Sequence, residues 1–402
     1  MKNPDLVRVG GPLALFVEGF RARLEVLGYA RGPQVVHMEL MAGLSRWLDE
    51  RGLDASGLTL EALQDFVAGR RAAGRRDARS MRSVRSLIEY LQEAGVPAPV
   101  RKPASGPVQT LLDGYARYLI HERGLAGLTV ARNVDLVRPF VAVQVGPDGL
   151  DLAGLSAGDV LAFMLVRSRV DRPATVQRAG TALRSLLRYL HLQGMIKNSL
   201  VGAVPSAANW RLTGLPKYLT GPQVSALLRS CDRSTAVGRR DLAVLTMLAR
   251  LGLRAGEVAG LRLEDIDWRR GEIIVRGKGN RHERLPLPGD VGETVVAYLN
   301  GFRPARLGVR EVFVGVRAPH RAMTRGSVTQ VVARAARRCG LPPIYAHRLR
   351  HTAATAMLHA GAPLQEIGQV LRHRHALTTA RYAKVDHDGL RALARPWPGV
   401  LR

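Results

Sequence analysis

The chain has 402 residues, with 60 lysines and arginines against 33 aspartates and glutamates, a formal net charge of +27. This length allows about two to four domains. So large a positive excess indicates a polyanionic partner, either nucleic acid or an anionic membrane surface. No apolar run approaches the roughly 20 residues that cross a bilayer, which argues against the membrane. We therefore expect a cytoplasmic protein that binds nucleic acid; a merely soluble basic protein is the alternative.

Two stretches rich in proline and glycine, residues 96–107 and about 202–216, divide the chain and indicate linkers. They predict three domains, residues 1–100, 108–205 and 215–402. Only two cysteines occur, Cys231 and Cys339, too far apart in sequence for a metal knuckle or a redox motif. A disulfide framework is therefore not expected, in keeping with a cytoplasmic location.

The first two predicted domains resemble each other. Three blocks recur in order and at a nearly constant offset: residues 16–20 with 111–115, 58–66 with 155–163, and 85–91 with 184–190. The last pair runs on to Gly95 and Gly194, and apolar residues in both copies recur at helical spacing. The pattern predicts two tandem all-helical domains. Chance similarity between helices rich in arginine and leucine is the alternative.

The first domain also carries a dense run of arginines with spacings of 3 to 4, which predicts that several share a helical face and contact DNA phosphates. Contact with another protomer, or a solvated face, would explain the run equally well. The run consists of Arg70, Arg71, Arg75, Arg76, Arg79, Arg82 and Arg85.

The last domain has a different pattern, mixed α+β and mainly helical with a small β-sheet. Thr220 and Gln223 form a capping-box signature before a helix, and a helical stretch covers residues 239–250. A β-hairpin is predicted over residues 271–288, with a Gly-Lys-Gly-Asn turn at 277–280. A short strand over residues 311–315 and a basic helix near 327–338 follow, and the remainder is helical.

Two features of this domain suggest phosphate chemistry. Arg254 and Glu257, at i and i+3, can pair on one helix face, although a surface ion pair has the same pattern. Lys278 stands at the hairpin tip in a chain whose basic residues include only six lysines. Lysine can release a proton when its neighbours lower its pKa, whereas arginine effectively cannot, so Lys278 is a candidate proton donor. A solvated turn residue is the alternative at a hairpin tip.

A second motif, H-x-x-R-H-T, places His347 and Arg350 one helical turn apart, where both can hold one phosphate. His347 and His351 also have the spacing of a zinc helix, but a zincin has glutamate where Arg348 stands. We therefore expect no metal.

His373 follows a leucine by two positions, and Tyr382 comes nine residues after His373. Taken alone, a tyrosine at this position would most often be a packing residue.

Together these residues resemble the tyrosine recombinase (phage integrase) family, over about residues 215–385. The family pattern is an arginine in G-L-R-x-x-E, a hairpin lysine, H-x-x-R-H-T, a histidine after a leucine, and a tyrosine nine residues on. It falls in order on Arg254, Lys278, His347, Arg350, His373 and Tyr382. Residues 108–205 resemble the helical core-binding domain of the family, so residues 1–100 are its expected second copy.

One position departs from the family pattern. The family usually has glycine just before the histidine, whereas this chain has Arg372. A left-handed backbone there would be unfavourable for arginine, which makes the geometry around His373 a point for the structure to decide.

The resemblance implies a reaction at a DNA phosphodiester. Tyr382 would attack the scissile phosphorus, giving a 3′-phosphotyrosine and a 5′ hydroxyl. Arg254 and Arg350 would hold the non-bridging oxygens, and Lys278 would protonate the leaving oxygen. His347 and His373 would donate hydrogen bonds, with His347 helping to deprotonate the tyrosine, while Glu257 would orient its neighbours. No cofactor is expected.

The resemblance also implies partners: double-stranded DNA, and a tetramer of the chain on two DNA sites. In that tetramer we expect the C-terminal tail of each chain, residues 386–402, to pack on a neighbouring protomer; folding back on its own domain is the alternative. Accessory recombinases or DNA-bending proteins would be further partners. Two alternatives stay open, a type IB topoisomerase that relaxes supercoils alone and a catalytically silent DNA-binding protein. The target sequence and the biological setting do not follow from the sequence.

Overall fold

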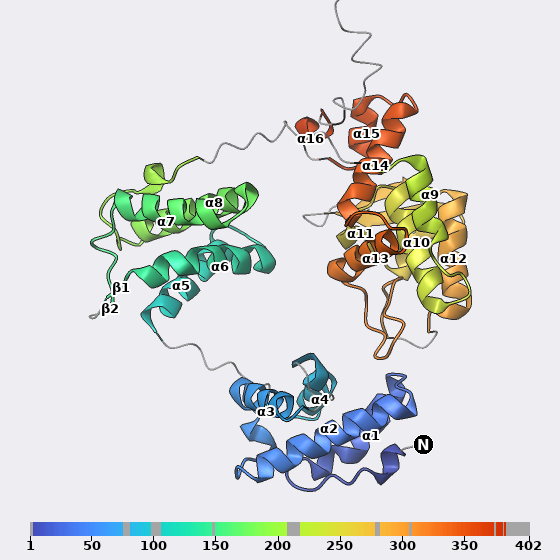
Figure 1. The fold of residues 1–402 in the computed structure, drawn as a ribbon, viewed down its shortest axis with the longest axis horizontal. Helices are drawn as coiled ribbons and strands as arrows, with labels where there is room; N and C mark the ends of the chain where they lie inside the picture. The colour runs from blue at the N-terminus through green and yellow to red at the C-terminus, as the bar shows by residue number, and fades with distance from the viewer. Residues whose placement is uncertain are drawn as a thin grey trace, which may run out of the picture. The chain divides into compact units, whose positions relative to one another are not determined.

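A computed structural model of the protein describes residues 3–74, 81–97, 106–146, 149–206, 218–277, 282–304, 308–373, 375–380 and 382. The chain is mostly helical with small antiparallel sheets, as the sequence predicts (Figure 1). By backbone proximity, residues 47–211 group into one compact unit and residues 1–46 with 212–402 into another. The three domain boundaries stay a prediction. Among the described residues, no helix is both long and apolar enough to cross a membrane.

In the first stretch of chain, the described residues 3–74 and 81–97 form four α-helices. The Thr59 hydroxyl accepts a hydrogen bond from the Ala62 N–H (3.1 Å) and so caps the third helix, and Gly95 follows the fourth with φ +91°. The helices are α1 (Val17–Val26), α2 (Arg31–Asp49), α3 (Leu60–Ala72) and α4 (Met81–Glu93). Short 3-10 helices cover Pro4–Leu6, Ala14–Phe16 and Ala55–Gly57 here, and Val201–Ala203 and Leu263–Asp265 further on.

The second stretch also contains four α-helices, which enclose a core that includes Leu112, Tyr115, Phe140 and Leu186. The helices are α5 (Pro107–His121), α6 (Gly127–Val143), α7 (Ala157–Val170) and α8 (Pro173–Leu192), with a small hairpin of β1 (Val145–Gly146) and β2 (Gly149–Leu150). Ser156 caps α7, and Gly194 follows α8 with φ +69°. The recurring sequence blocks fall on corresponding helices: α1 and α5, α3 and α7, α4 and α8.

The C-terminal stretch combines helices with a three-stranded antiparallel sheet. The capping box of Thr220 and Gln223 is confirmed at the start of the first helix. The helices are α9 (Gly221–Arg229), α10 (Ala236–Arg250), α11 (Ala255–Ala259), α12 (Gly289–Phe302), α13 (Arg325–Arg338), α14 (Ala346–His359), α15 (Leu364–Val370) and α16 (Ala376–Ala380).

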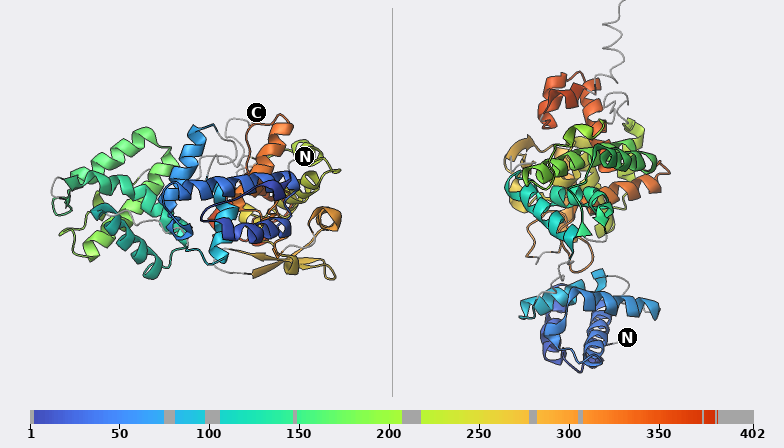
Figure 2. Two further views of the ribbon diagram at one scale, coloured as in Figure 1. Left: turned by 90° about the horizontal axis from the view of Figure 1, so that it is seen from below. Right: turned by 90° about the vertical axis from the view of Figure 1, so that its left-hand side faces the viewer.

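The predicted hairpin is confirmed as β4 (Glu272–Arg276) and β5 (His282–Pro286), with β3 (Ile266–Asp267) beside β4. The left-hand view of Figure 2 shows this sheet at its lower right. Ile273 and Val275 on the buried face of β4 join a core with residues of α9, α10, α12 and α13.

The prediction of a strand over residues 311–315 is wrong. Only isolated bridges form there, Arg262 to Glu311 and Val314 to Ala322. Side chains satisfy Val314 instead: its N–H donates to the Tyr298 hydroxyl (3.3 Å), and its carbonyl accepts from Nη1 of Arg240 (3.3 Å). The neighbouring backbone groups do pair with backbone, the Val312 N–H with the Leu261 carbonyl and the Phe313 carbonyl with the Met323 N–H. Because side chains take both backbone groups of Val314, these pairings do not join into a continuous ladder.

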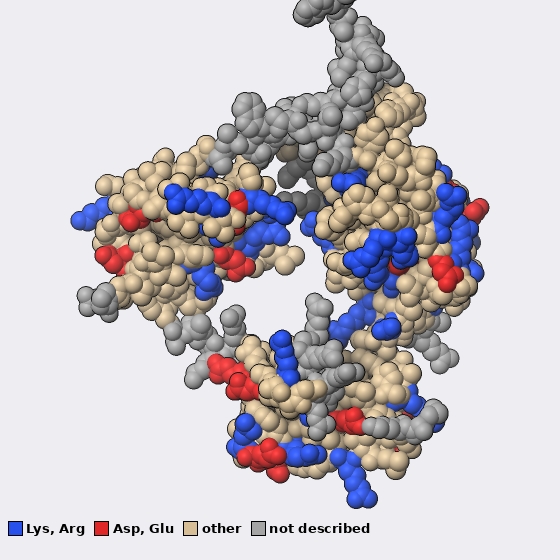
Figure 3. Space-filling view, viewed as in Figure 1, with Lys and Arg blue, Asp and Glu red and all other residues tan. Residues whose placement is uncertain are grey.

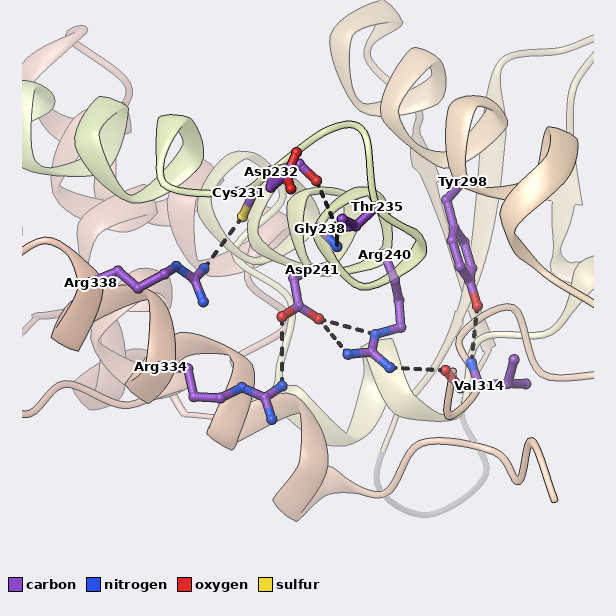
Figure 4. Close-up of polar contacts among 10 residues, drawn as sticks. All are labelled: Cys231, Asp232, Thr235, Gly238, Arg240, Asp241, Tyr298, Val314, Arg334 and Arg338. Atoms are coloured by element: carbon purple, nitrogen blue, oxygen red, sulfur yellow. Dashed lines mark hydrogen bonds and ion pairs between the residues drawn. The ribbon is translucent and has the colours of Figure 1, made fainter. Parts of the chain in front are cut away.

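An ion cluster around the buried Asp241 links α10 and α13 (Figure 4). The carboxylate of Asp241, on α10, accepts hydrogen bonds from Nε and Nη2 of the adjacent Arg240 (3.0 and 2.7 Å). Its second oxygen lies 3.6 Å from Nη2 of Arg334, on α13. Since Arg240 also reaches the Val314 carbonyl, α10, α13 and the 312–314 segment are fastened together.

Candidate active site

Gly252 shapes the loop between α10 and α11. Its φ is +59°, and a Cβ there would lie 2.6 Å from Cδ2 of Leu371 and 3.3 Å from Cβ of Ala353. The backbone conformation favours glycine, and a Cβ would require the fully buried Leu371 side chain to move. The Gly252 carbonyl accepts a hydrogen bond from Nη1 of Arg350 (2.7 Å), so this close approach also orients one of the predicted site residues.

Arg254 and Glu257 pair as predicted, with Nη1 of Arg254 2.7 Å from Oε1 of Glu257. The shared helix face is not confirmed, because Arg254 is the N-cap of α11 with an extended backbone (φ −75°, ψ 148°). Glu257 also accepts the Arg254 backbone N–H through Oε2 (2.8 Å). The pair is not a simple surface bridge, since the Glu257 side chain is only 4% exposed against 44% for Arg254.

Arg350 is buried on α14, with only 1% of its surface exposed. Its Nη1 donates to the Gly252 carbonyl and its Nη2 to the Leu371 carbonyl, which fixes the plane of the guanidinium. Burial first, and then the nearby charge of Arg254, lower the pKa of Arg350 to about 10. The group therefore remains a cation at neutral pH.

Arg372 adopts the left-handed conformation in which the family pattern has glycine. Its φ is +55°, in a Schellman turn that closes α15: the Arg372 N–H donates to the Gln369 carbonyl and the His373 N–H to that of Gly368. For an arginine this conformation costs about 1–2 kcal/mol. Its side chain is 3% exposed, and Nη2 lies 2.7 Å from Oε2 of Glu257.

Glu257 thus receives two guanidinium groups. Burial alone would raise the pKa of this carboxyl, but the charge of Arg372 and the hydrogen bonds from Arg254 outweigh burial, and the pKa lies below its ordinary value. The carboxylate is therefore ionised and holds both arginines.

Tyr382 is buried (1% exposed) in a small cluster with Ala354, Ile367 and Leu371. Its hydroxyl oxygen lies 2.8 Å from Nδ1 of His351, one turn after His347 on α14.

His373 stacks parallel to the Tyr382 ring at a centroid distance of 6.2 Å, and its Nδ1 lies 2.7 Å from Oγ1 of Thr379. Burial first, then the charges of Arg350 and Arg254, lower the pKa of His373 to about 4. The ring is therefore neutral at pH 7.

The structure brings most of the predicted site residues together. Arg350 bonds to the carbonyls of Gly252 and Leu371, and Arg254 bonds to the carbonyl of the adjacent Arg372. Tyr382 packs on Leu371 and stacks on His373. His347 is exposed, and its ring lies 4.3 Å from that of His351. Lys278, which comes between β4 and β5 in the sequence, lies outside the described residues.

Sequence reasoning missed two participants. The sequence suggests His351 only as a zinc ligand, yet it is the histidine that contacts the Tyr382 hydroxyl; its spacing of one helical turn from His347 is the available signal. Arg372 stood out only as a departure from glycine, and nothing in the sequence indicated that its side chain reaches Glu257.

The arginine run of the first stretch does not lie on one helical face. Gly74, with φ +70°, follows α3 and α4 begins only at Met81, so the run is divided between two helices. Arg70 lies over the Phe66 ring (5.5 Å), and Arg85 pairs with Glu89 (2.9 Å). Arg75, Arg76, Arg79 and the side chain of Arg82 lie outside the described residues. That these arginines bind DNA stays a prediction.

Comparison with known proteins identifies the relatives of this chain. Residues 217–388 match the model of the Phage integrase family. The integrase/recombinase y4rA of Sinorhizobium fredii is 40% identical over 397 residues, covering 97% of this chain and 95% of the relative. Tyrosine recombinase XerD of Listeria monocytogenes is 31% identical over 280 residues, 68% of this chain and 94% of the relative. A lambda integrase tetramer bound to a Holliday junction shares the fold, with a TM-score of 0.54 at 16% identity, covering 74% of this chain and 85% of that one.

Proposed function

Because the chain belongs to the phage integrase family of tyrosine recombinases, we propose that it cleaves and rejoins DNA strands through a covalent bond between Tyr382 and a 3′ phosphate. The observation that supports this most directly is the cluster in which Tyr382 packs on Leu371 while the carbonyl of Leu371 binds the buried guanidinium of Arg350. A tyrosine nucleophile and a phosphate-binding cation are thereby held by the same residue. The relatives do not favour a type IB topoisomerase or a silent DNA-binding protein.

These positions support the following cleavage step. The Tyr382 oxygen forms a bond to the scissile phosphorus as the bond to the 5′ oxygen breaks. Arg350 and Arg254 stabilise the non-bridging oxygens, on which charge is redistributed in the transition state. The neutral His373 adds a hydrogen bond without bringing a further charge.

The proton transfers need an acceptor and a donor. We assign the acceptor of the Tyr382 proton to His351, since its Nδ1 already lies 2.8 Å from the hydroxyl. His347, to which the sequence analysis gave this role, packs against the His351 ring and would contact the phosphate instead. Lys278 would protonate the leaving 5′ oxygen, and the reverse step would return both protons. No metal or cofactor takes part in this scheme.

The proposed substrate is double-stranded DNA, and the proposed active assembly is a tetramer of this chain on two DNA sites. The charge supports the first part: on the face shown in Figure 3, basic side chains predominate over acidic ones on the part of the chain that carries α9–α15. The tetramer of lambda integrase on a Holliday junction supports the second. The tail, residues 386–402, lies outside the described residues, and its packing on a neighbour stays part of the proposal.

Residues 1–100 and 108–205 are proposed to be two copies of one helical DNA-binding domain. The support is that the recurring sequence blocks begin or lie within corresponding helices, and that a glycine with positive φ follows both α4 and α8. The additional copy would extend the DNA contacted by each protomer.

Trapping the covalent adduct tests the proposed function. The chain is expressed in bacterial cells, DNA linked covalently to it is recovered after denaturation, and that DNA is sequenced. A discrete site should be recovered with the wild type, none with Tyr382→Phe, and less with His351→Ala than with His347→Ala. An adduct that survives in Tyr382→Phe would refute the assignment of the nucleophile.

A further inference from the structure

Arg372 occupies a position whose backbone favours glycine. The turn after α15 needs a residue with positive φ, and glycine would meet this need without strain, whereas arginine does so at a cost. The backbone therefore gives no reason for an arginine here. Its side chain does, because it is nearly fully buried and ends on the carboxylate of Glu257.

Arg372 contacts the Arg254–Glu257 pair through both its side chain and its backbone. Through its side chain, Nη2 donates to Oε2 of Glu257, the oxygen that also accepts the Arg254 backbone N–H. Through its backbone, the Arg372 carbonyl accepts a hydrogen bond from Nη2 of Arg254 (3.3 Å). Arg254 itself is 44% exposed, so these contacts are what restrict the orientation of its guanidinium.

We propose that Arg372 is a positioning residue for Arg254: it fixes the Glu257 carboxylate and, with its own carbonyl, holds the Arg254 guanidinium in the orientation that binds the scissile phosphate. This inference rests on the proposed function and deepens it. A guanidinium has five N–H donors in a rigid fork. The contacts of the Arg254 guanidinium with Glu257 and Arg372 fix its orientation. Its remaining N–H donors are therefore positioned by the protein before DNA binds.

The test measures the rate of covalent adduct formation by the full chain under single-turnover conditions. The probe is a nicked duplex carrying the site recovered by adduct trapping, with either a normal phosphate or a methylphosphonate at the scissile position. A methylphosphonate lacks one charged non-bridging oxygen and therefore depends less on a correctly placed arginine. Arg254→Ala provides the reference, and Arg250→Ala, which removes an exposed bridge to Asp290, is the matched control.

Arg372→Gly suits the left-handed backbone of the turn and removes the side chain, with its bonds to Glu257 and to the Val370 carbonyl. We expect it to slow cleavage of the normal phosphate about 100-fold, as a displaced catalytic group does. DNA affinity should stay close to that of the wild type. The defect should shrink on the methylphosphonate in parallel with that of Arg254→Ala, and Arg372→Lys should recover part of the rate because it keeps a cation at Glu257.

Two results would overturn the inference: wild-type cleavage by Arg372→Gly, or a defect equally large on both probes, which would mean a general structural role. The wild type and Tyr382→Phe are run beside the variants. Failure of the wild type to form an adduct would count against the proposed function, whereas a wild-type adduct with an unaffected Arg372→Gly would count only against Arg372.

Discussion

Replacing Gly252 with alanine should disrupt both the stability and the chemistry of the C-terminal unit. The added Cβ would lie 2.6 Å from Cδ2 of Leu371 and 3.3 Å from Cβ of Ala353, at a φ of +59°. The left-handed backbone costs about 1–2 kcal/mol for a residue with a side chain, and overpacking adds about 1–3 kcal/mol. We therefore expect a loss of about 2–5 kcal/mol in the free energy of unfolding.

The same change should impair cleavage more than stability alone requires. Gly252 and Leu371, the two residues forced apart, supply the carbonyls that hold the Arg350 guanidinium. A shift of about 1 Å in such a group lowers the rate about 100-fold. Adduct formation by Gly252→Ala should therefore fall strongly even at temperatures at which the chain is fully folded.

Calorimetry of the full chain is the assay for stability. A loss of this size should lower the midpoint of one thermal transition by roughly 4–20 °C for a unit of this size. Gly256→Ala is the matched control: it lies within α11 with no atom near its Cβ position, and it should stabilise the chain by about 0.5–1 kcal/mol. If Gly252→Ala melted within a degree of the wild type, the steric argument would be refuted.

Three further predictions concern other parts of the chain. Lys278→Ala should cleave normal DNA poorly but recover on a 5′-bridging phosphorothiolate, whose thiolate leaves without a proton; no selective recovery would exclude Lys278 as the acid. Burial, and then the charge of Arg350, lower the pKa of His373 from 6.5 to about 4. Between these pH values the unfolded chain binds a proton at His373 and the folded chain does not, so the free energy of unfolding should fall as pH drops from 6.5 toward 4. His373→Asn should flatten that melting profile, and an unchanged slope would contradict it. A chain starting at Pro107 should still form the adduct, with a shorter footprint and a salt slope shallower by about 0.9 per lost phosphate contact. An unchanged footprint would indicate that residues 1–100 serve assembly.

The local elements could be predicted because short-range chemistry determines them. Thr220 and Gln223 cap the same helix whatever surrounds them, and the alternation around Ile273 and Val275 defines a strand with one buried face. The expected strand at residues 311–315 failed for the opposite reason. The backbone groups of Val314 bond to the side chains of Tyr298 and Arg240, which no local pattern could indicate.

The sequence by itself determined which residue types the site contains and their order along the chain, because motif spacing on helices and hairpins is a local property. Only the tertiary structure decided which histidine meets the Tyr382 hydroxyl, since His347 and His351 share a helix face and the choice depends on where Tyr382 packs. The same holds for Arg372. The sequence predicted an unfavourable backbone at Arg372 but not the contact of its side chain with Glu257. These two residues are more than a hundred positions apart and meet only because folding places the turn after α15 against α11.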